Sequence, residues 1–157
     1  LPEIPYDINS VARQILARRD AGKAFSIVVV AEVALSKEEA LMDKKTFKKS
    51  RLEMTNSIGY RVAHELEAAT SLESRVTVLG YLQRGGTPSP YDRVLASQFG
   101  IAAADFLAHG EFGELVALQN NKIVGVPLKD VAGKVKNIPL DHPLLLGARS
   151  LGTCFGD

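Results

Sequence analysis

This sequence has few of the features that mark secreted, membrane-spanning or nucleic-acid-binding proteins. Cys154 is the only cysteine, so no disulfide can form within the chain, and a reducing cytoplasm is the natural compartment. No apolar run approaches the length of a membrane span. The charge is nearly balanced, with 19 basic and 18 acidic residues, so no general nucleic-acid or anionic membrane surface is implied.

The start of the chain also lacks the features of a natural beginning. Residues 1–5 have no basic start followed by an apolar region, so they do not form a signal peptide. They contain no initiator methionine either, and we expect a piece of a longer chain.

The composition is that of one globular domain. The chain has 157 residues, of which 46% are apolar and 24% charged, enough to bury a core and too apolar for disorder. Asp7 is a good helix cap, and the apolar spacing after it predicts a helix ending near residue 21, before Gly22. A second helix is predicted up to about residue 69, with Ile58, Val62 and Leu66 as its apolar stripe.

A valine-rich run over residues 25–31 predicts a strand. It shows no alternation, which is typical of a parallel strand covered on both faces. Glu32 follows at the carboxyl end, where open α/β sheets place their ligand crevice. The carboxylate is therefore a candidate functional group, and a strand-terminal residue turned to solvent is an equally good interpretation.

Residues 36–51 are strongly charged and compatible with a helix. We expect a solvated face or an insertion there, although the cluster from Lys44 to Arg51 could contact an anion. Nucleic-acid binding through this cluster is the weaker interpretation, because Phe47 is its single aromatic residue, and a series of aromatic side chains is needed to stack on successive bases.

Residues 75–93 combine a short strand, a glycine-rich loop and a helix start, with an arginine in each part. Gly85 and Gly86 let the backbone approach a ligand closely. Ser89, Pro90 and Asp92 then predict a capped helix that ends near Gly110. A helix N-terminus beside guanidinium groups favours an anion, most plausibly a phosphate, whereas a structural turn with surface arginines is the plainer alternative.

The remaining chain completes an α/β pattern. A strand is predicted at residues 114–118 and another at 123–126, joined by a turn at Asn120, Asn121 and Lys122. Residues 128–132 are compatible with one helical turn.

Residues 76–97 resemble the signature of the 6-phosphofructokinase family, in which Leu-Gly-His-x-Gln-Arg-Gly-Gly-x-Pro is followed by Asp-Arg and a helix. Here the string is Leu79-Gly80-Tyr81-Leu82-Gln83-Arg84-Gly85-Gly86-Thr87-Pro88. Residues 1–5, the Gly-Lys before the valine-rich run and residues 117–121 resemble the second half of the same family. Nearly the whole chain is covered, and residues 35–52 match least well.

The resemblance implies specific roles for individual residues. It implies that Glu32 binds the sugar of fructose 6-phosphate, and that Arg84 and the position of Tyr81 hold its phosphate. It also implies that Arg75 reaches the 6-phosphate in a neighbouring subunit. Two guanidinium groups suit a dianionic phosphate, because each can form paired, charge-assisted hydrogen bonds. Arg93 has no implied ligand, and we expect it to be structural.

Three positions depart from the family, and one of them is Val33, which stands where the family commonly has glycine. Tyr81 replaces a histidine, so a neutral phenol must donate where a charged ring could. Lys23 matches an effector-site lysine, but Ala21 occupies the place of a second basic residue, so effector control is an open question.

The resemblance also implies what a longer protein would contain. Its fold would be a parallel-sheet, Rossmann-like sandwich, of which this chain is the second half. Residues 1–84 would belong to the sugar-phosphate domain, and residues 85–157 would return to the larger domain and form the tail. ATP and Mg²⁺ would be bound mainly by the first half, whose Gly-Gly-Asp motif and catalytic aspartate do not occur here.

The chain is therefore expected to be part of a glycolytic enzyme that phosphorylates fructose 6-phosphate. The resemblance implies that this enzyme is an allosteric, cytoplasmic homotetramer. The 157-residue chain alone is predicted to be inactive, because phosphoryl transfer needs a placed donor, a metal and a base. A pyrophosphate-dependent relative and a non-catalytic sugar-phosphate-binding module remain the alternatives. Neither nucleic acid nor a membrane is expected as a partner.

Overall fold

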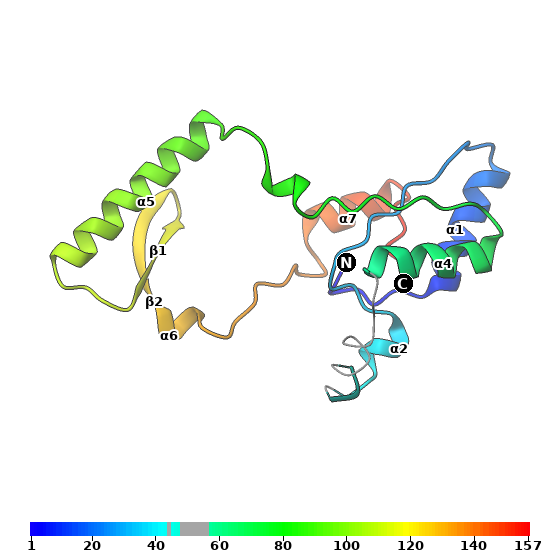
Figure 1. Cartoon of the computed structure of the whole chain (residues 1–157), viewed down its shortest axis with the longest axis horizontal. Helices are drawn as coiled ribbons and strands as arrows, with labels where there is room; N and C mark the ends of the chain where they lie inside the picture. Colours follow the sequence, from blue (N-terminus) through cyan, green and yellow to red (C-terminus); the bar gives the residue numbers. More distant parts are fainter. Residues whose placement is uncertain (44, 48–56) are drawn as a thin grey trace. The chain divides into compact units, whose positions relative to one another are not determined.

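The computed structural model describes residues 1–43, 45–47 and 57–157, and combines helices with one small sheet (Figure 1). The chain divides into two compact units. Unit 1 comprises residues 1–78 and 137–157, and unit 2 comprises residues 79–136. The mixed helix and strand content agrees with the predicted α/β class.

Unit 1 is built on two helices that pack against each other, α1 (Ile8–Asp20) and α4 (Ile58–Thr70). Asp7 caps α1 by accepting a hydrogen bond from the amide of Asn9, as its position predicted. The apolar stripe of α4 is buried as expected. The core cluster consists of Tyr6, Ala12, Ile58, Val62 and Leu66, with Ile8, Val11, Ile15 and Val30 packed around it.

The end of the chain returns to the start of α1. The backbone carbonyl of Gly156 accepts from the amide of Asp7 at 2.6 Å, and that of Asp157 accepts from Ser10 Oγ at 3.0 Å. A helix that the sequence analysis missed, α7 (Pro143–Ser150), precedes this return. Its signal was present, because Pro143 occupies a first-turn position and His142 Nδ1 accepts from the amide of Leu144.

Unit 2 consists of a helix, a hairpin and a short helical turn: α5 (Pro90–Ala108), β1 (Glu114–Gln119), β2 (Lys122–Pro127) and α6 (Leu128–Val131). The antiparallel strands pair from Glu114 with Pro127 to Gln119 with Lys122. Asn120 and Asn121 form the turn with φ of 49° and 60°, a conformation that asparagine tolerates. The predicted hairpin and capped helix are both confirmed.

The predicted parallel strands are not formed. Residues 25–31 and 75–79 have no regular secondary structure, and the sheet of the described residues is the two-stranded hairpin. A β-strand exists only through hydrogen bonds to neighbours, so a sequence with strand propensity stays irregular when no partner strand pairs with it. One parallel bridge, between Tyr6 and Ser36, is present in unit 1.

The charged stretch is only partly described. Lys44, Lys48, Lys49 and Arg51, on which the suggested anion contact depended, lie outside the described residues. Its first turn forms α2 (Lys37–Ala40), and there the expectation of a solvated face is wrong for Glu39, whose residue is only 8% exposed. Burial is possible because Arg61 neutralises this carboxylate.

Within the described residues, no helix has both the length and the apolar character needed to cross a membrane.

Candidate functional site

Glu32 lies in an exposed turn immediately after the valine-rich segment. The amide of Ala34 donates to the carbonyl of Ala31 at 3.0 Å and closes this turn. Ala34 itself is only 3% exposed, so the chain re-enters the core two residues after the carboxylate. The Glu32 side chain is exposed while the residues on either side of its turn are anchored. This arrangement suits a carboxylate that accepts hydrogen bonds from a ligand's hydroxyl groups.

Arg75 follows α4 in an extended segment of unit 1. Its Nε lies 3.1 Å from Glu73 Oε1, and the two side chains are 88% and 74% exposed. An ion pair this exposed contributes little to stability, since solvent screens it. The guanidinium is thus open to exchange Glu73 for a stronger anionic partner such as a phosphate.

Tyr81 and Arg84 lie at the two ends of a single helical turn, η1 (Leu82–Arg84). The amide of Arg84 donates to the carbonyl of Tyr81 at 3.1 Å, which holds both residues on one turn. Tyr81 is 92% exposed. Gly86 then adopts a φ of +107°, a conformation that residues with a Cβ rarely take, so a glycine is favoured at this position.

The N-terminus of α5 is satisfied by its own side chains. Ser89 Oγ accepts from the amide of Asp92 at 3.2 Å, and Asp92 Oδ2 accepts from the amide of Ser89 at 2.8 Å. The Ser89 hydroxyl also donates to Asp92 Oδ2 at 2.7 Å, and this bond, together with the one from the Ser89 amide, lowers the pKa of Asp92, so the carboxylate stays charged at this helix end. An incoming phosphate would meet that negative charge, so the arginines rather than the helix end must supply its binding energy.

Arg93 and Lys23 differ in which group contacts the backbone: the side chain of Arg93 and the amide of Lys23. Arg93 Nε donates to the carbonyl of Pro88 at 3.4 Å, which agrees with the expected structural role. Lys23 follows the end of α1, where its amide donates to the carbonyl of Arg18 at 3.0 Å, and the residue is exposed.

The five predicted site residues are divided between the two units. Lys23, Glu32 and Arg75 belong to unit 1, whereas Tyr81 and Arg84 belong to unit 2. The structure brings Tyr81 and Arg84 together on η1.

A cluster of polar side chains in unit 1 was missed by the sequence analysis. Arg61 on α4 donates to Glu39 at 2.6 and 2.8 Å and to the hydroxyl of Tyr6 at 3.1 Å. The Tyr6 hydroxyl donates in turn to Glu65 Oε2 at 3.2 Å. Two sequence signals could have found it: the Ser36-x-x-Glu39 capping box and the four-residue spacing of Arg61 and Glu65.

The same cluster shifts the ionisation of its members. Burial raises the pKa of the Tyr6 phenol to about 12, although the nearby Arg61 charge opposes the shift. Hydrogen bonds to Glu39 raise the pKa of the Arg61 guanidinium above its ordinary value. Both shifts extend to higher pH the range in which the phenol is neutral and the guanidinium is charged.

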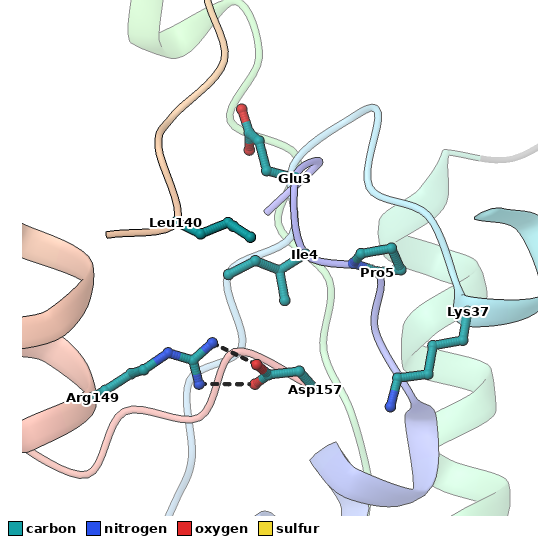
Figure 2. Close-up of a pocket in the computed structure, with 7 residues that line it drawn as sticks. All are labelled: Glu3, Ile4, Pro5, Lys37, Leu140, Arg149 and Asp157. Carbon is teal, nitrogen blue, oxygen red and sulfur yellow. Dashed lines mark hydrogen bonds and ion pairs between the residues drawn. The ribbon is translucent and has the colours of Figure 1, made fainter. Parts of the chain in front are cut away.

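Unit 1 also contains an open pocket of about 290 Å³, shown in Figure 2. Its lining residues are Glu3, Ile4, Pro5, Lys37, Leu140, Arg149 and Asp157. The guanidinium of Arg149 points at the Asp157 carboxylate and forms two hydrogen bonds with it, one of 3.0 Å. None of the predicted site residues lines this pocket, and its principal cation is already paired.

Comparison with known proteins defines the family. The sequence pattern of the family described as phosphofructokinase matches residues 1–107. The chain therefore belongs to the phosphofructokinase family, and the resemblance of residues 76–97 is confirmed.

Curated relatives carry a more specific name. An "ATP-dependent 6-phosphofructokinase" of Spirochaeta thermophila is 56% identical over 161 aligned residues, which cover 100% of this chain and 43% of the relative. Proteins of the same name from Propionibacterium freudenreichii and Chloroflexus aurantiacus are 42% and 45% identical, with 47% and 42% of their lengths covered. The chain spans less than half the length of these relatives.

Proposed function

We propose that this chain is the carboxy-terminal part of an ATP-dependent 6-phosphofructokinase and supplies its sugar-phosphate site. The whole enzyme would transfer the γ-phosphoryl group of ATP to O1 of fructose 6-phosphate. The observation that carries the proposal is the arginine and glycine motif at residues 79–88, within a chain that is 56% identical throughout to a protein of that name.

The chemistry of the exposed side chains supports this role. Arg84 would form paired, charge-assisted hydrogen bonds to the 6-phosphate, and the Tyr81 hydroxyl would add a neutral donor from the same turn. Glu32 would accept hydrogen bonds from the sugar hydroxyls and so orient the ring. These groups bind and place the acceptor, and they leave the phosphoryl transfer itself to other residues.

Arg75 is assigned to a neighbouring subunit's site, within a cytoplasmic homotetramer. Its exposed guanidinium, paired only through a solvent-screened contact with Glu73, is free to reach across an interface. Lys23, exposed at the end of α1, is assigned to an effector site.

The donor side belongs to the preceding part of the longer protein. Mg²⁺ prefers carboxylate and water oxygens, and the described residues contain no group of three or more His, Cys, Asp or Glu side chains that could hold a metal. This donor set does not fit a magnesium–nucleotide site. We further propose that residues 25–31 and 75–79 pair as parallel strands of a Rossmann-like sandwich in the whole enzyme, with the domain boundary near residue 84.

The central test is substitution in the full-length enzyme. Arg84→Ala should raise the KM for fructose 6-phosphate roughly 10- to 100-fold, because a hydrogen bond to a charged group contributes about 1.5–3 kcal/mol. Glu32→Ala should raise it about tenfold. Arg93→Ala removes an arginine from the same motif and should leave this KM within twofold of wild type. A wild-type KM in Arg84→Ala would show that the site is wrongly assigned.

Two assays separate the alternatives. A coupled assay of the full-length enzyme with ATP and then with pyrophosphate identifies the donor. Turnover with pyrophosphate but not with ATP would support a pyrophosphate-dependent enzyme. The 157-residue chain should show no turnover above a mock preparation. Calorimetry of that chain with fructose 6-phosphate should show weak or no binding, whereas tight binding would favour a non-catalytic sugar-phosphate module.

A further inference from the structure

A buried ion pair connects α2 to α4. The guanidinium of Arg61 donates from Nη1 to Glu39 Oε1 at 2.6 Å and from Nη2 to Glu39 Oε2 at 2.8 Å. The side chains are 25% and 8% exposed. A carboxylate this buried is costly unless it is neutralised, and the two parallel hydrogen bonds fix the pair in one geometry. The Arg61–Glu39 pair is therefore a rigid link between these helices.

The same guanidinium holds both sides of the parallel bridge in unit 1. On one side, Arg61 Nη2 also donates to the Tyr6 hydroxyl at 3.1 Å. On the other side, Glu39 belongs to the capping box with Ser36, in which Glu39 Oε2 accepts from the Ser36 amide at 3.0 Å. The bridge itself consists of two backbone hydrogen bonds of 2.9 Å, from Tyr6 to Leu35 and from Lys37 to Tyr6. Arg61 thus reinforces this bridge through the Tyr6 hydroxyl on one side and through Glu39, which accepts from the Ser36 amide, on the other.

The turn that carries Glu32 ends where this bridge begins. Only Val33 and the buried Ala34 separate Glu32 from Leu35, whose carbonyl accepts from Tyr6. On the other side of the turn, Val30 packs against the core cluster. The backbone of Glu32 is therefore fixed on its amino side by the packing of Val30 and on its carboxyl side by the bridge.

We propose that Arg61 is a positioning residue that holds the Glu32 turn, through Glu39 and Tyr6, in the orientation needed to bind fructose 6-phosphate. This inference rests on the proposed function, in which Glu32 contacts the sugar. A carboxylate displaced by about 1 Å loses much of its binding contribution, because hydrogen bonds depend steeply on distance and angle. Arg61 would act on the affinity for the sugar and leave donor binding unaffected.

Steady-state kinetics of the full-length Arg61→Met enzyme tests the proposal. Methionine keeps much of the side-chain length and removes both hydrogen bonds to Glu39. We expect the KM for fructose 6-phosphate to rise about tenfold, while the KM for ATP and kcat at saturating sugar stay within twofold. Arg61→Lys should be intermediate, because lysine keeps the charge without the planar fork. The control is Arg19→Met, which removes an exposed arginine paired with its neighbour Asp20 and should change neither KM.

A double-mutant cycle shows whether Arg61 acts through Glu32. In a Glu32→Ala background, Arg61→Met should raise the KM for fructose 6-phosphate by less than twofold, because the turn then carries no carboxylate for Arg61 to position. A full tenfold rise in that background would overturn the proposal. So would an unchanged sugar KM in Arg61→Met, or a loss of kcat with both KM values at wild type, which is the result of a purely structural role.

The outcomes also separate this inference from the proposed function. If Glu32→Ala itself leaves the sugar KM unchanged, the assignment of the site fails. If Glu32→Ala raises it and Arg61→Met does not, only the positioning role fails. KM does not depend on the fraction of enzyme that folds, so a partly folded preparation still decides the question. Should Arg61→Met yield no folded enzyme, Arg61→Lys and Glu39→Gln take its place, with several-fold increases in sugar KM expected and wild-type values contradicting the proposal.

Discussion

The two units of this chain differ in how far they bury their apolar side chains. In unit 1, α1 and α4 enclose a core, and the buried apolar residues of the described chain all lie there: Ile4, Tyr6, Ala12, Ala34, Ile58, Val62, Leu66 and Leu145. Across residues 79–136, which are described in full, no residue is buried. Unit 2 therefore has secondary structure without a closed core.

The contrast is clearest in their helices. α4 buries Ile58, Val62 and Leu66 on one stripe. α5 is longer, at 19 residues, and buries none, with Val94 and Ile101 exposed by 58% and 64%. Capping and local propensity are sufficient to specify α5 as a helix, but most helical stability in proteins comes from tertiary packing. The comparison indicates that unit 1 carries most of the chain's own folding free energy.

The largest expected effect comes from removing a core side chain of unit 1. Leu66→Ala should lower the free energy of unfolding of the chain by about 2–5 kcal/mol, because the residue is 5% exposed and its loss leaves a cavity. Leu107→Ala, at a position 63% exposed in unit 2, should cost no more than about 0.5 kcal/mol. Urea unfolding followed by circular dichroism measures both, and equal losses would contradict the comparison.

Adding a methyl group should also discriminate between the units. At Gly156 a Cβ would lie 2.9 Å from Tyr6 Cβ and 3.2 Å from Val11 Cγ2, and its φ is +86°. Gly156→Ala should therefore cost about 2–3 kcal/mol from crowding and backbone strain. At Gly125 a Cβ would lie 3.1 Å from Glu114 Oε2 and 3.2 Å from Phe106 Cε2, which are the ends of side chains rather than backbone atoms. Gly125→Ala should cost about 1 kcal/mol or less in the same unfolding experiment, and the reverse order would count against the packing described here.

Among the residues that the structure describes, each unit has one capping box, which permits a matched comparison of smaller effects. Ser89→Ala removes an exposed cap of α5 and should cost about 0.5–1 kcal/mol. Ser36→Ala should cost more, about 1–2 kcal/mol, because its partner Glu39 is buried and paired with Arg61. Denaturant midpoints of the two variants decide this, and a larger loss for Ser89→Ala would place the stronger cap in unit 2.

A last expected effect appears only at alkaline pH. The folded pKa of Tyr6 is about 12 and the unfolded value is about 10, so the native state holds this proton more tightly. The contribution is complete below pH of about 10 and is lost as the pH rises towards 12. Tyr6→Phe should flatten this part of the stability profile, whereas Tyr91→Phe, at an exposed position of unit 2, should retain it. A wild-type slope in Tyr6→Phe would assign the effect to another group.

The local features of the fold were predictable because their causes are local. Asp7 and Ser89 predict the starts of α1 and α5, because their side chains cap the helix N-termini. The spacing of Ile58, Val62 and Leu66 defines the buried face of α4. The hairpin follows from two short apolar runs around Asn120 and Asn121. The two expected parallel strands failed, since strand propensity at residues 25–31 and 75–79 cannot supply the neighbouring strands that make a sheet.

In the candidate site, too, some features could be predicted from the sequence and others depended on contacts between distant segments. From the sequence, the family resemblance predicts Glu32, Arg75, Tyr81, Arg84 and Lys23 as site residues, because a motif can be matched without coordinates. Tertiary structure decided that a member of a charged run, Glu39, is buried, and that Arg61 links it to Tyr6 across 55 positions of sequence. Charge patterning reports only neighbours along the chain, whereas burial and ion pairing depend on which distant segments the fold brings together.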